Sequence, residues 1–195
     1  MEDGRKGALA LTVRLFPDLI ALYRSAYSGA PYFELFTEEE VKHLLVELMS
    51  KREIALYVAI AKDGEIAGFT WGYGLSPDEE IARQLEGLEE LPEELRSAIK
   101  GSRAAYIAEL AVDSRFRNRG IGTKLVSDIV EDFRRRGFTH VVVRTNVGNI
   151  PAKRIYEKLG FVQIPGSAHP VEHERISSGL RADLRVFFYK EIDIA

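Results

Sequence analysis

Apolar side chains recur at helical spacing near the start of the chain. The pattern covers residues 15–27 and predicts a helix, which the sequence Ser28-Gly29-Ala30-Pro31 ends. A second helix is predicted to begin at Thr37, because Glu40 three residues later completes a capping-box pattern. We therefore expect the chain to begin with two helices.

The pattern then changes from helical spacing to runs of strand-forming residues. Residues 54–61 are continuously apolar and predict a strand. The sequence Lys62-Asp63-Gly64-Glu65 predicts a hairpin turn, and residues 66–74 predict the partner strand. A β-hairpin is therefore expected directly after the two helices.

The next segment, residues 76–103, is acidic and carries an apolar stripe at helical spacing. Leu91-Pro92 predicts a break between two short helices, which would be inserted between two strands. The acidic residues are Asp78, Glu79, Glu80, Glu86, Glu89, Glu90, Glu93 and Glu94. Two interpretations stay open: a solvated acidic surface over a core-facing stripe, or a lid or wall of an acceptor site that attracts a cationic amine.

The second half of the chain alternates between strands and helices. A helix over 121–136 ends at Gly137, and another begins near Pro151 and ends at Gly160. The apolar runs predict strands over 106–112, 139–144, 161–164 and 184–190. A long polar loop is expected over 165–183.

Composition narrows the class of protein. A chain of 195 residues suits one domain with a sizeable core. Its net charge of -3 argues against a general nucleic-acid binder. The lack of cysteine excludes disulfides, thiolate metal sites and a cysteine nucleophile. We find neither a signal peptide nor an apolar run that would cross a membrane, which is consistent with a cytoplasmic protein.

The turn Arg117-Asn118-Arg119-Gly120-Ile121-Gly122 joins an apolar strand to a helix start. Helix N-termini present backbone N–H groups without intrahelical partners, and glycine lets an anionic ligand approach the backbone closely. A dinucleotide fingerprint would need glycine where Leu125 stands, and a P-loop would need Ser or Thr after Gly-Lys, whereas Thr123 precedes Lys124. The turn predicts a phosphate site of a different kind.

Residues 106–161 resemble the GCN5-related N-acetyltransferase (GNAT) family. The matching features are Glu109-Leu110-Ala111-Val112, the basic turn, and the block Asn-x-x-Ala-x-x-x-Tyr-x-x-x-Gly-Phe that runs from Asn149 to Phe161. The resemblance implies an α/β fold with a mixed central sheet of about six to seven strands flanked by helices, whose splayed strand pair forms the acyl-CoA cleft. The lack of internal repeats and flexible linkers indicates a single domain over residues 1–195, in which 76–103 is an acidic helical insertion that the resemblance explains least.

Acetyl-CoA is the co-substrate that this resemblance implies. In the family the basic turn holds the pyrophosphate, and the pantetheine arm lies along the preceding strand. An N–H near Leu110 would polarise the thioester carbonyl. The implied cofactor-binding residues are Leu110, Ala111, Val112, Arg117, Asn118, Arg119, Gly120, Ile121, Gly122, Thr123, Asn149 and Tyr156.

Two residues are candidates for catalysis. Tyr156 matches the position where the family often carries a general acid for the leaving thiolate; otherwise it is a helix tyrosine with its hydroxyl at the surface. Glu109 is the candidate base on an otherwise apolar strand, with a salt bridge to Arg144 or substrate anchoring as alternatives. Without a base, the amine arrives neutral or loses its proton through water. Asn149 is expected to contact the cofactor, cap its helix, or do both.

No metal is predicted. His169 and His173 are four residues apart, but they lie in a predicted surface loop that does not hold both on one face. The aromatic group Tyr27, Tyr32, Phe33 and Phe36 lies where the family shapes its acceptor pocket, and is either pocket lining or core.

The sequence is therefore interpreted as an N-acetyltransferase that moves an acetyl group from acetyl-CoA to a primary amine by direct attack in a ternary complex. The acceptor, a small molecule or a protein, stays open, as does a homodimer, and no nucleic acid or membrane partner is expected. The alternatives are a non-catalytic acyl-CoA-binding sensor and a scaffold without affinity for CoA.

Overall fold

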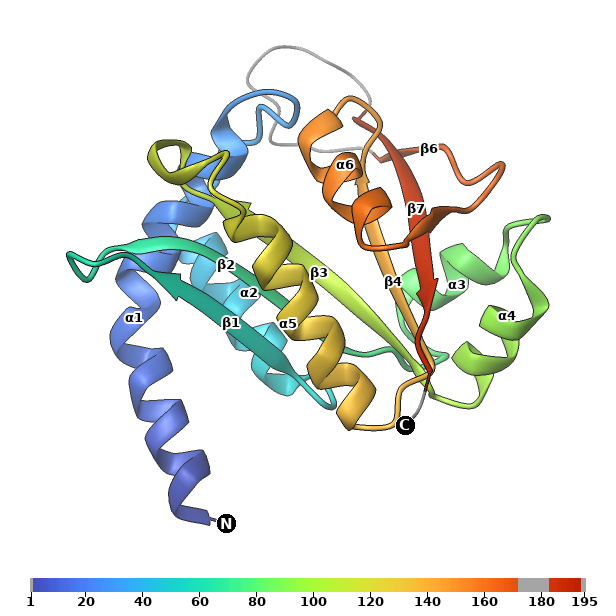
Figure 1. The fold of residues 1–195 in the computed structure, drawn as a ribbon, viewed down its shortest axis with the longest axis horizontal. Helices are drawn as coiled ribbons and strands as arrows, with labels where there is room; N and C mark the ends of the chain where they lie inside the picture. The colour runs from blue at the N-terminus through green and yellow to red at the C-terminus, as the bar shows by residue number, and fades with distance from the viewer. Residues whose placement is uncertain (1, 172–182, 194–195) are drawn as a thin grey trace.

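The computed structural model describes residues 2–171 and 183–193 as alternating helices and strands (Figure 1). The helices are α1 (Glu2–Ser28), α2 (Glu38–Ser50), α3 (Glu80–Glu86), α4 (Glu93–Lys100), the 3₁₀ helix η1 (Ser114–Phe116), α5 (Ile121–Arg135) and α6 (Ile150–Lys158). The strands are β1 (Ala55–Ile60), β2 (Ile66–Gly74), β3 (Ala104–Val112), β4 (His140–Asn146), β5 (Val162–Gln163), β6 (His169–Val171) and β7 (Asp183–Glu191).

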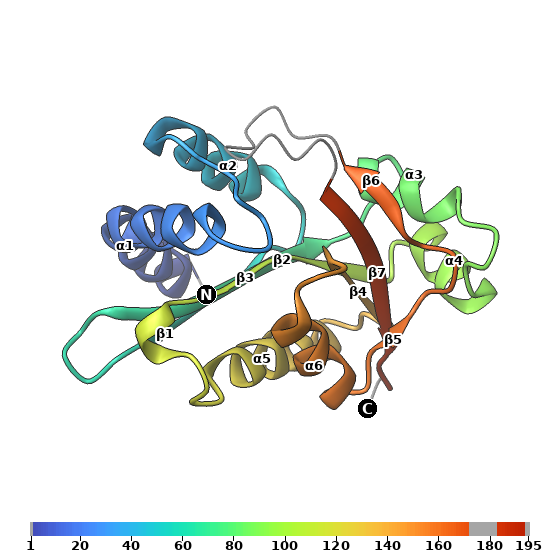
Figure 2. The same cartoon turned by 90° about the horizontal axis from the view of Figure 1, so that it is seen from above.

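The described strands form one mixed sheet in the order β1-β2-β3-β4-β7-β5, and β6 pairs with β7. Only β3 and β4 run parallel, and the other pairs are antiparallel. Helices α1 to α4 cover one face, and α5 and α6 cover the other (Figure 2). This arrangement confirms the predicted α/β fold.

Each face of the sheet has its own core. Leu19, Leu45 and Leu95 pack on the face of α1 to α4, and Ile129 and Phe133 pack on the face of α5 and α6. Alternation along β7 sends consecutive side chains to different cores, because neighbouring strand residues point to opposite faces. The sheet therefore separates the molecule into two sides.

Most predicted elements are present, with two corrections. The capping box at Thr37 and Glu40 is confirmed. The helix predicted over 15–27 begins earlier, at Glu2, so the local turn signals Asp3-Gly4 and Gly7 do not end it. Residues 165–183 were predicted to be a loop throughout, which is wrong for β6; its partner β7 lies far along the sequence, so local pattern gives no signal for it.

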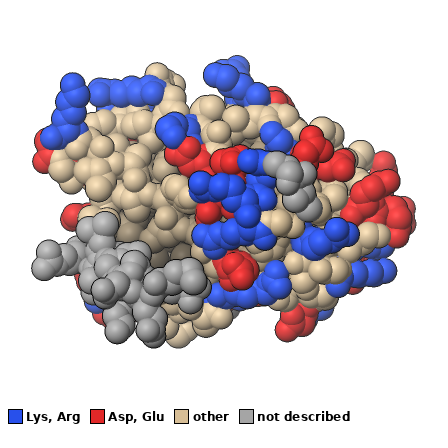
Figure 3. All heavy atoms as spheres, turned by 60° about the horizontal axis from the view of Figure 1, so that its bottom comes forward, with Lys and Arg blue, Asp and Glu red and all other residues tan. Residues whose placement is uncertain are grey.

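The segment 76–103 forms the two short helices α3 and α4, with Pro92 at the N-cap of α4. Its apolar stripe is buried, including Leu85, Leu95 and Ile99. Acidic side chains gather over these helices at the right-hand edge of the surface (Figure 3). The interpretation as a solvated acidic surface over a core-facing stripe accounts for this part of the chain.

No helix in the described part of the chain has the length and apolarity needed to cross a membrane.

Candidate active site

Strands β3 and β4 are paired only at their beginnings. The parallel register joins Ala104 to His140 and ends where Ile107 meets Val143. Both strands continue beyond this point, and they diverge in Figure 1. Among the described strands, one edge of β3 therefore has no partner beyond Ile107, which leaves alternate backbone groups available there. The predicted splayed strand pair is confirmed.

A pocket lies between the two strands and is lined by residues from both faces of the sheet. Glu109 and Arg144 line it from β3 and β4, Tyr156 from α6, and Tyr32 from the segment after α1. A wider depression beside the C-terminal end of β7 contains none of these residues. We call this pocket between the diverging ends of β3 and β4 the splay pocket. It brings together the two candidate catalytic residues, Glu109 and Tyr156.

A β-bulge sets the direction of Glu109. Trp71 of β2 stands opposite Glu109, but the next residue, Gly72, stands opposite Ile107, so Ala108 is an extra residue in β3. A bulge shifts the alternation of side chains by one residue. As a result Glu109 contacts the tyrosines of α1, whereas Leu110 packs against the core of α5 and α6.

The carboxylate of Glu109 accepts hydrogen bonds from the hydroxyls of Tyr23, at 3.2 Å, and Tyr27. Burial raises the pKa of Glu109 to about 7, against the opposing effect of the Tyr27 hydrogen bond. A carboxylate with this pKa is well matched to accept a proton at neutral pH.

The alternative in which Glu109 forms a salt bridge with Arg144 is wrong. Strands β3 and β4 diverge before Arg144 is reached. The Nη1 of Arg144 instead donates to Oε1 of Gln84 on α3, at 3.0 Å. No ion pair joins Arg144 to Glu109 among the residues described. The remaining interpretations of Glu109 are a base or a substrate anchor.

Tyr156 lies on the α6 side of the pocket. Only 3% of the residue is exposed, so Tyr156 is buried, whereas the alternative interpretation expected its hydroxyl at the surface. Burial raises the pKa of Tyr156 well above its ordinary value, which keeps the hydroxyl protonated at neutral pH. Its hydroxyl has no hydrogen-bond partner among the described residues, so it is available to donate to a ligand.

Asn149 has two roles at the start of α6. Its side-chain oxygen accepts from the Ala152 N–H at 3.2 Å, which confirms the predicted helix cap. Its Nδ2 donates to the hydroxyl of Tyr32 at 3.0 Å. The cap therefore also ties α6 to the segment between α1 and α2.

The basic turn leads from β3 through η1 into α5. Asn118 and Gly120 have φ values of 60° and 79°, in the left-handed region that favours glycine. Arg119 is exposed, and the Nε of Arg117 donates to the carbonyl of Val112 at 3.2 Å. Helix hydrogen bonding begins with the N–H of Lys124, so the preceding N–H groups of α5 are open to an anion.

The glycine at position 122 is required for helix packing. A Cβ there would stand 2.8 Å from Cδ1 of Ile155 on α6 and 3.6 Å from Cγ2 of Val112. Sequence reasoning assigned this glycine to ligand approach. The structure adds that it lets α5 and α6 approach each other closely.

We expect strong coupling between positions 122 and 155 in stability measurements. Gly122→Ala introduces a clash that costs about 1–3 kcal/mol by overpacking, partly offset by about 1 kcal/mol from the higher helix propensity of alanine. Ile155→Val removes Cδ1, so the double variant should be more stable than the sum of the single changes predicts, by about 1 kcal/mol. Chemical denaturation of the four proteins measures this coupling, and additive effects would contradict the packing argument.

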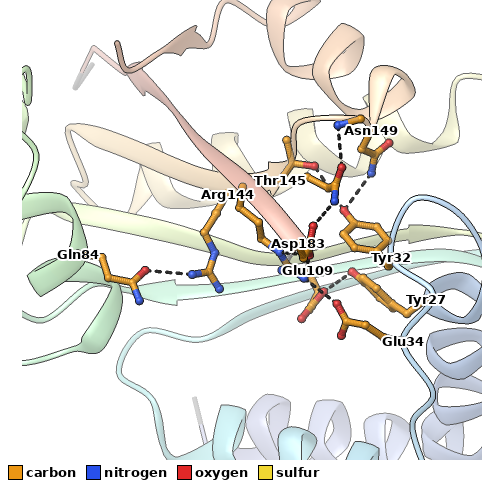
Figure 4. A network of polar contacts seen from close by, with 12 residues as sticks. Tyr27, Tyr32, Glu34, Gln84, Glu109, Arg144, Thr145, Asn149 and Asp183 are labelled. Atoms are coloured by element: carbon orange, nitrogen blue, oxygen red, sulfur yellow. Dashed lines mark hydrogen bonds and ion pairs between the residues drawn. The ribbon is translucent and has the colours of Figure 1, made fainter. Parts of the chain in front are cut away.

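A buried polar network on the α1 side of the pocket was missed by sequence reasoning (Figure 4). Arg185 pairs with Glu34 at 2.7 Å and with Asp183 at 2.6 Å. The side chain of Asn146 donates to Asp183. These residues come from distant parts of the chain, and only the isolated polar positions within apolar strands gave a signal for them.

The aromatic group predicted near the acceptor pocket divides between two roles. Tyr27 and Tyr32 line the pocket, whereas Phe36 is buried in the core and Phe33 has a left-handed φ of 54°. His169 lies on β6, where its ring stacks on Phe187, and His173 lies outside the described residues. Among the described residues, no group of three metal-ligating side chains comes together.

Comparison with known proteins gives a consistent result. The family model described as "Acetyltransferase (GNAT) family" matches residues 16–161. N-alpha-acetyltransferase 30 of Xenopus laevis is 44% identical over 61 residues, which are 31% of this chain and only 22% of that protein. An N-alpha-acetyltransferase of Sulfurisphaera tokodaii is 27% identical over 133 residues, which are 65% of this chain and 68% of that protein.

The solved structures show the same fold. The structure of yncA from Salmonella typhimurium with its cofactor acetyl-CoA superposes with a TM-score of 0.61 and 15% identity. The superposition covers 92% of this chain and 90% of that chain.

Proposed function

The chain belongs to the acetyltransferase (GNAT) family, and from this membership we propose that it transfers the acetyl group of acetyl-CoA to the α-amine of a protein or peptide. The observation that carries the proposal is the splay pocket, which has Glu109 and Tyr156 on its walls. The basic turn lies separately, at the start of α5. The N-alpha-acetyltransferases among its relatives support the choice of an α-amine.

The two faces of the sheet divide the substrates between them. The basic turn and Tyr156 belong to the α5 and α6 face, so the co-substrate binds there with its phosphates on the N–H groups of α5. The free edge of β3 then hydrogen-bonds the pantetheine arm. Glu109 faces α1, so the acceptor enters from the face of α1 to α4.

The reaction proceeds by direct attack. Glu109 takes a proton from the amine, and the nitrogen lone pair forms a bond to the carbonyl carbon of the thioester. The carbon–sulfur bond breaks, and its electron pair stays on sulfur. The Tyr156 hydroxyl donates a proton to the leaving thiolate, and the products are the acetylated amine and CoA. Tyr156 then regains a proton from solvent and Glu109 releases the proton that it took, which restores both groups. No cysteine is available for a covalent acetyl-enzyme.

Binding of acetyl-CoA is expected to depend on the charge at position 120. A Cβ at Gly120 meets nothing within 4 Å, so the matched variants Gly120→Glu and Gly120→Gln differ in charge and share the same backbone strain. A carboxylate beside the open N–H groups repels phosphate, and we expect Gly120→Glu to bind at least about tenfold more weakly than Gly120→Gln. Calorimetric titration with acetyl-CoA measures both affinities.

Equal affinities of the two variants would contradict a phosphate site at this turn.

The acceptor is tested by incubating the purified protein with acetyl-CoA and peptides with free N-termini. Mass spectrometry then locates the acetyl group. Binding of acetyl-CoA without transfer to any amine would instead support a sensor.

A further inference from the structure

Arg144 is a cation in the splay pocket without a carboxylate partner in the described chain. Its Nη1 donates to Oε1 of Gln84 at 3.0 Å, and its side chain also interacts with the hydroxyl of Tyr106. Its Nε is buried and has no hydrogen-bond partner. The ring of Phe187 lies 6.0 Å from the guanidinium carbon. A partly buried charge with an unsatisfied donor is unfavourable unless a ligand completes it.

The second arginine of the pocket is different. Arg185 pairs with both Glu34 and Asp183, at 2.7 and 2.6 Å, so protein carboxylates neutralise its charge. Both arginines lie on the same face of the sheet, and only Arg144 leaves part of its guanidinium uncompensated. The difference identifies Arg144 as the residue with capacity to bind an anion.

The anion does not come from the co-substrate. Its phosphates are assigned to the N-terminus of α5, on the opposite face of the sheet, and its pantetheine arm and acetyl group are uncharged. Arg144 is the first residue of β4 beyond the paired segment, and its side chain reaches Gln84 on the face of α1 to α4. That face is the acceptor side, where Glu109 also points.

We propose that Arg144 binds a carboxylate of the acceptor and makes the enzyme selective for N-termini with an acidic side chain in the first two residues. The inference rests on the proposed function, since it specifies the acceptor of the same site. A guanidinium binds a carboxylate through two parallel N–H···O bonds, which a neutral amide cannot match in strength.

The proposal also gives the insertion 76–103 a role in specificity. Gln84 of α3 holds Nη1 of Arg144 and so orients the guanidinium in the pocket. Gln84 is a positioning residue, and its own side chain is uncharged. We expect Gln84→Ala to raise KM for acidic peptides and leave KM for matched neutral peptides unchanged.

The test uses matched peptides that carry Glu or Gln at position one or at position two. For the native protein, kcat/KM for the better Glu peptide should exceed that of its Gln counterpart about tenfold. In Arg144→Gln this ratio should fall to near one, mainly through KM, while Arg144→Lys should keep part of it. Arg83→Gln removes an exposed arginine of α3 outside the pocket and serves as the control. Thermal unfolding of each variant checks folding.

A ratio near one in the native protein, or an unchanged ratio in Arg144→Gln, would overturn the proposal while leaving the acetyltransferase function intact. A further arm compares free alanine with alanine amide. If the native protein prefers free alanine and Arg144→Gln does not, Arg144 recognises a carboxylate, but the acceptor is an amino acid and the peptide acceptor is wrong. Acetylation of no amine, with acetyl-CoA still bound, would overturn both the proposed function and this inference.

Discussion

Replacing Glu109 with glutamine is expected to lower kcat about 10²-fold or more, because the variant loses the group that takes the proton of the amine. The amide has nearly the shape of the carboxylate: its oxygen still accepts from one tyrosine of α1, and its NH2 group can donate to the hydroxyl of the other. Affinity for acetyl-CoA should be unchanged, since Glu109 faces away from α5 and α6. Steady-state kinetics with calorimetric titration separates these two effects.

The pH dependence follows from the pKa of Glu109, which burial raises to about 7. A base must be deprotonated to act, so native kcat should rise with pH through about 7 and reach a plateau above it. The inflection should be lost in Glu109→Gln. Tyr27→Phe removes a hydrogen bond that lowers the pKa of Glu109, so its inflection should move to higher pH. A profile identical in all three proteins would exclude Glu109 as the base.

Replacing Tyr156 with phenylalanine is expected to lower kcat about 10²-fold, because the leaving thiolate then receives no proton from the enzyme. The buried ring remains, and the lost hydroxyl has no partner among the described residues, so the unfolding temperature should change little. Burial raises the pKa of Tyr156 well above its ordinary value, so the native enzyme should keep its activity at moderately alkaline pH.

The control for this variant is Tyr57→Phe on β1, a tyrosine outside the pocket. It should have native kcat and native affinity for acetyl-CoA. Native turnover in Tyr156→Phe would remove this hydroxyl from the mechanism and leave water as the source of the proton.

The fold was largely predictable because most of its helices and strands are determined by sequence patterns within a few residues. The capping box at Thr37 and the break at Pro92 are signals within a few residues, and the structure contains both. Strand β6 gave no such signal, because it depends on pairing with β7. The prediction for the start of α1 was wrong because apolar periodicity was clear only from residue 15, whereas helix geometry extends back to Glu2.

The site was predictable as a set of residues but not as a set of contacts. Glu109 and Tyr156 were identified from a motif, yet the partners of Glu109 on α1 are more than eighty residues away in sequence. The bulge at Ala108 cannot be read from an apolar run. The pairing with Arg144 assumed that adjacent strands stay adjacent, and the splay removes that condition.

The close approach of Gly122 to Ile155 has a consequence for protein engineering. Ile155 precedes Tyr156 directly, so the helix with the proposed acid packs against the helix that follows the proposed phosphate-binding turn. The contact between Gly122 and Ile155 therefore helps to set the distance between the proposed phosphate-binding turn and the proposed acid. A designer who wishes to accept a longer or shorter acyl carrier would have to change this contact first, since redesign of the pocket walls alone leaves the distance between turn and acid the same.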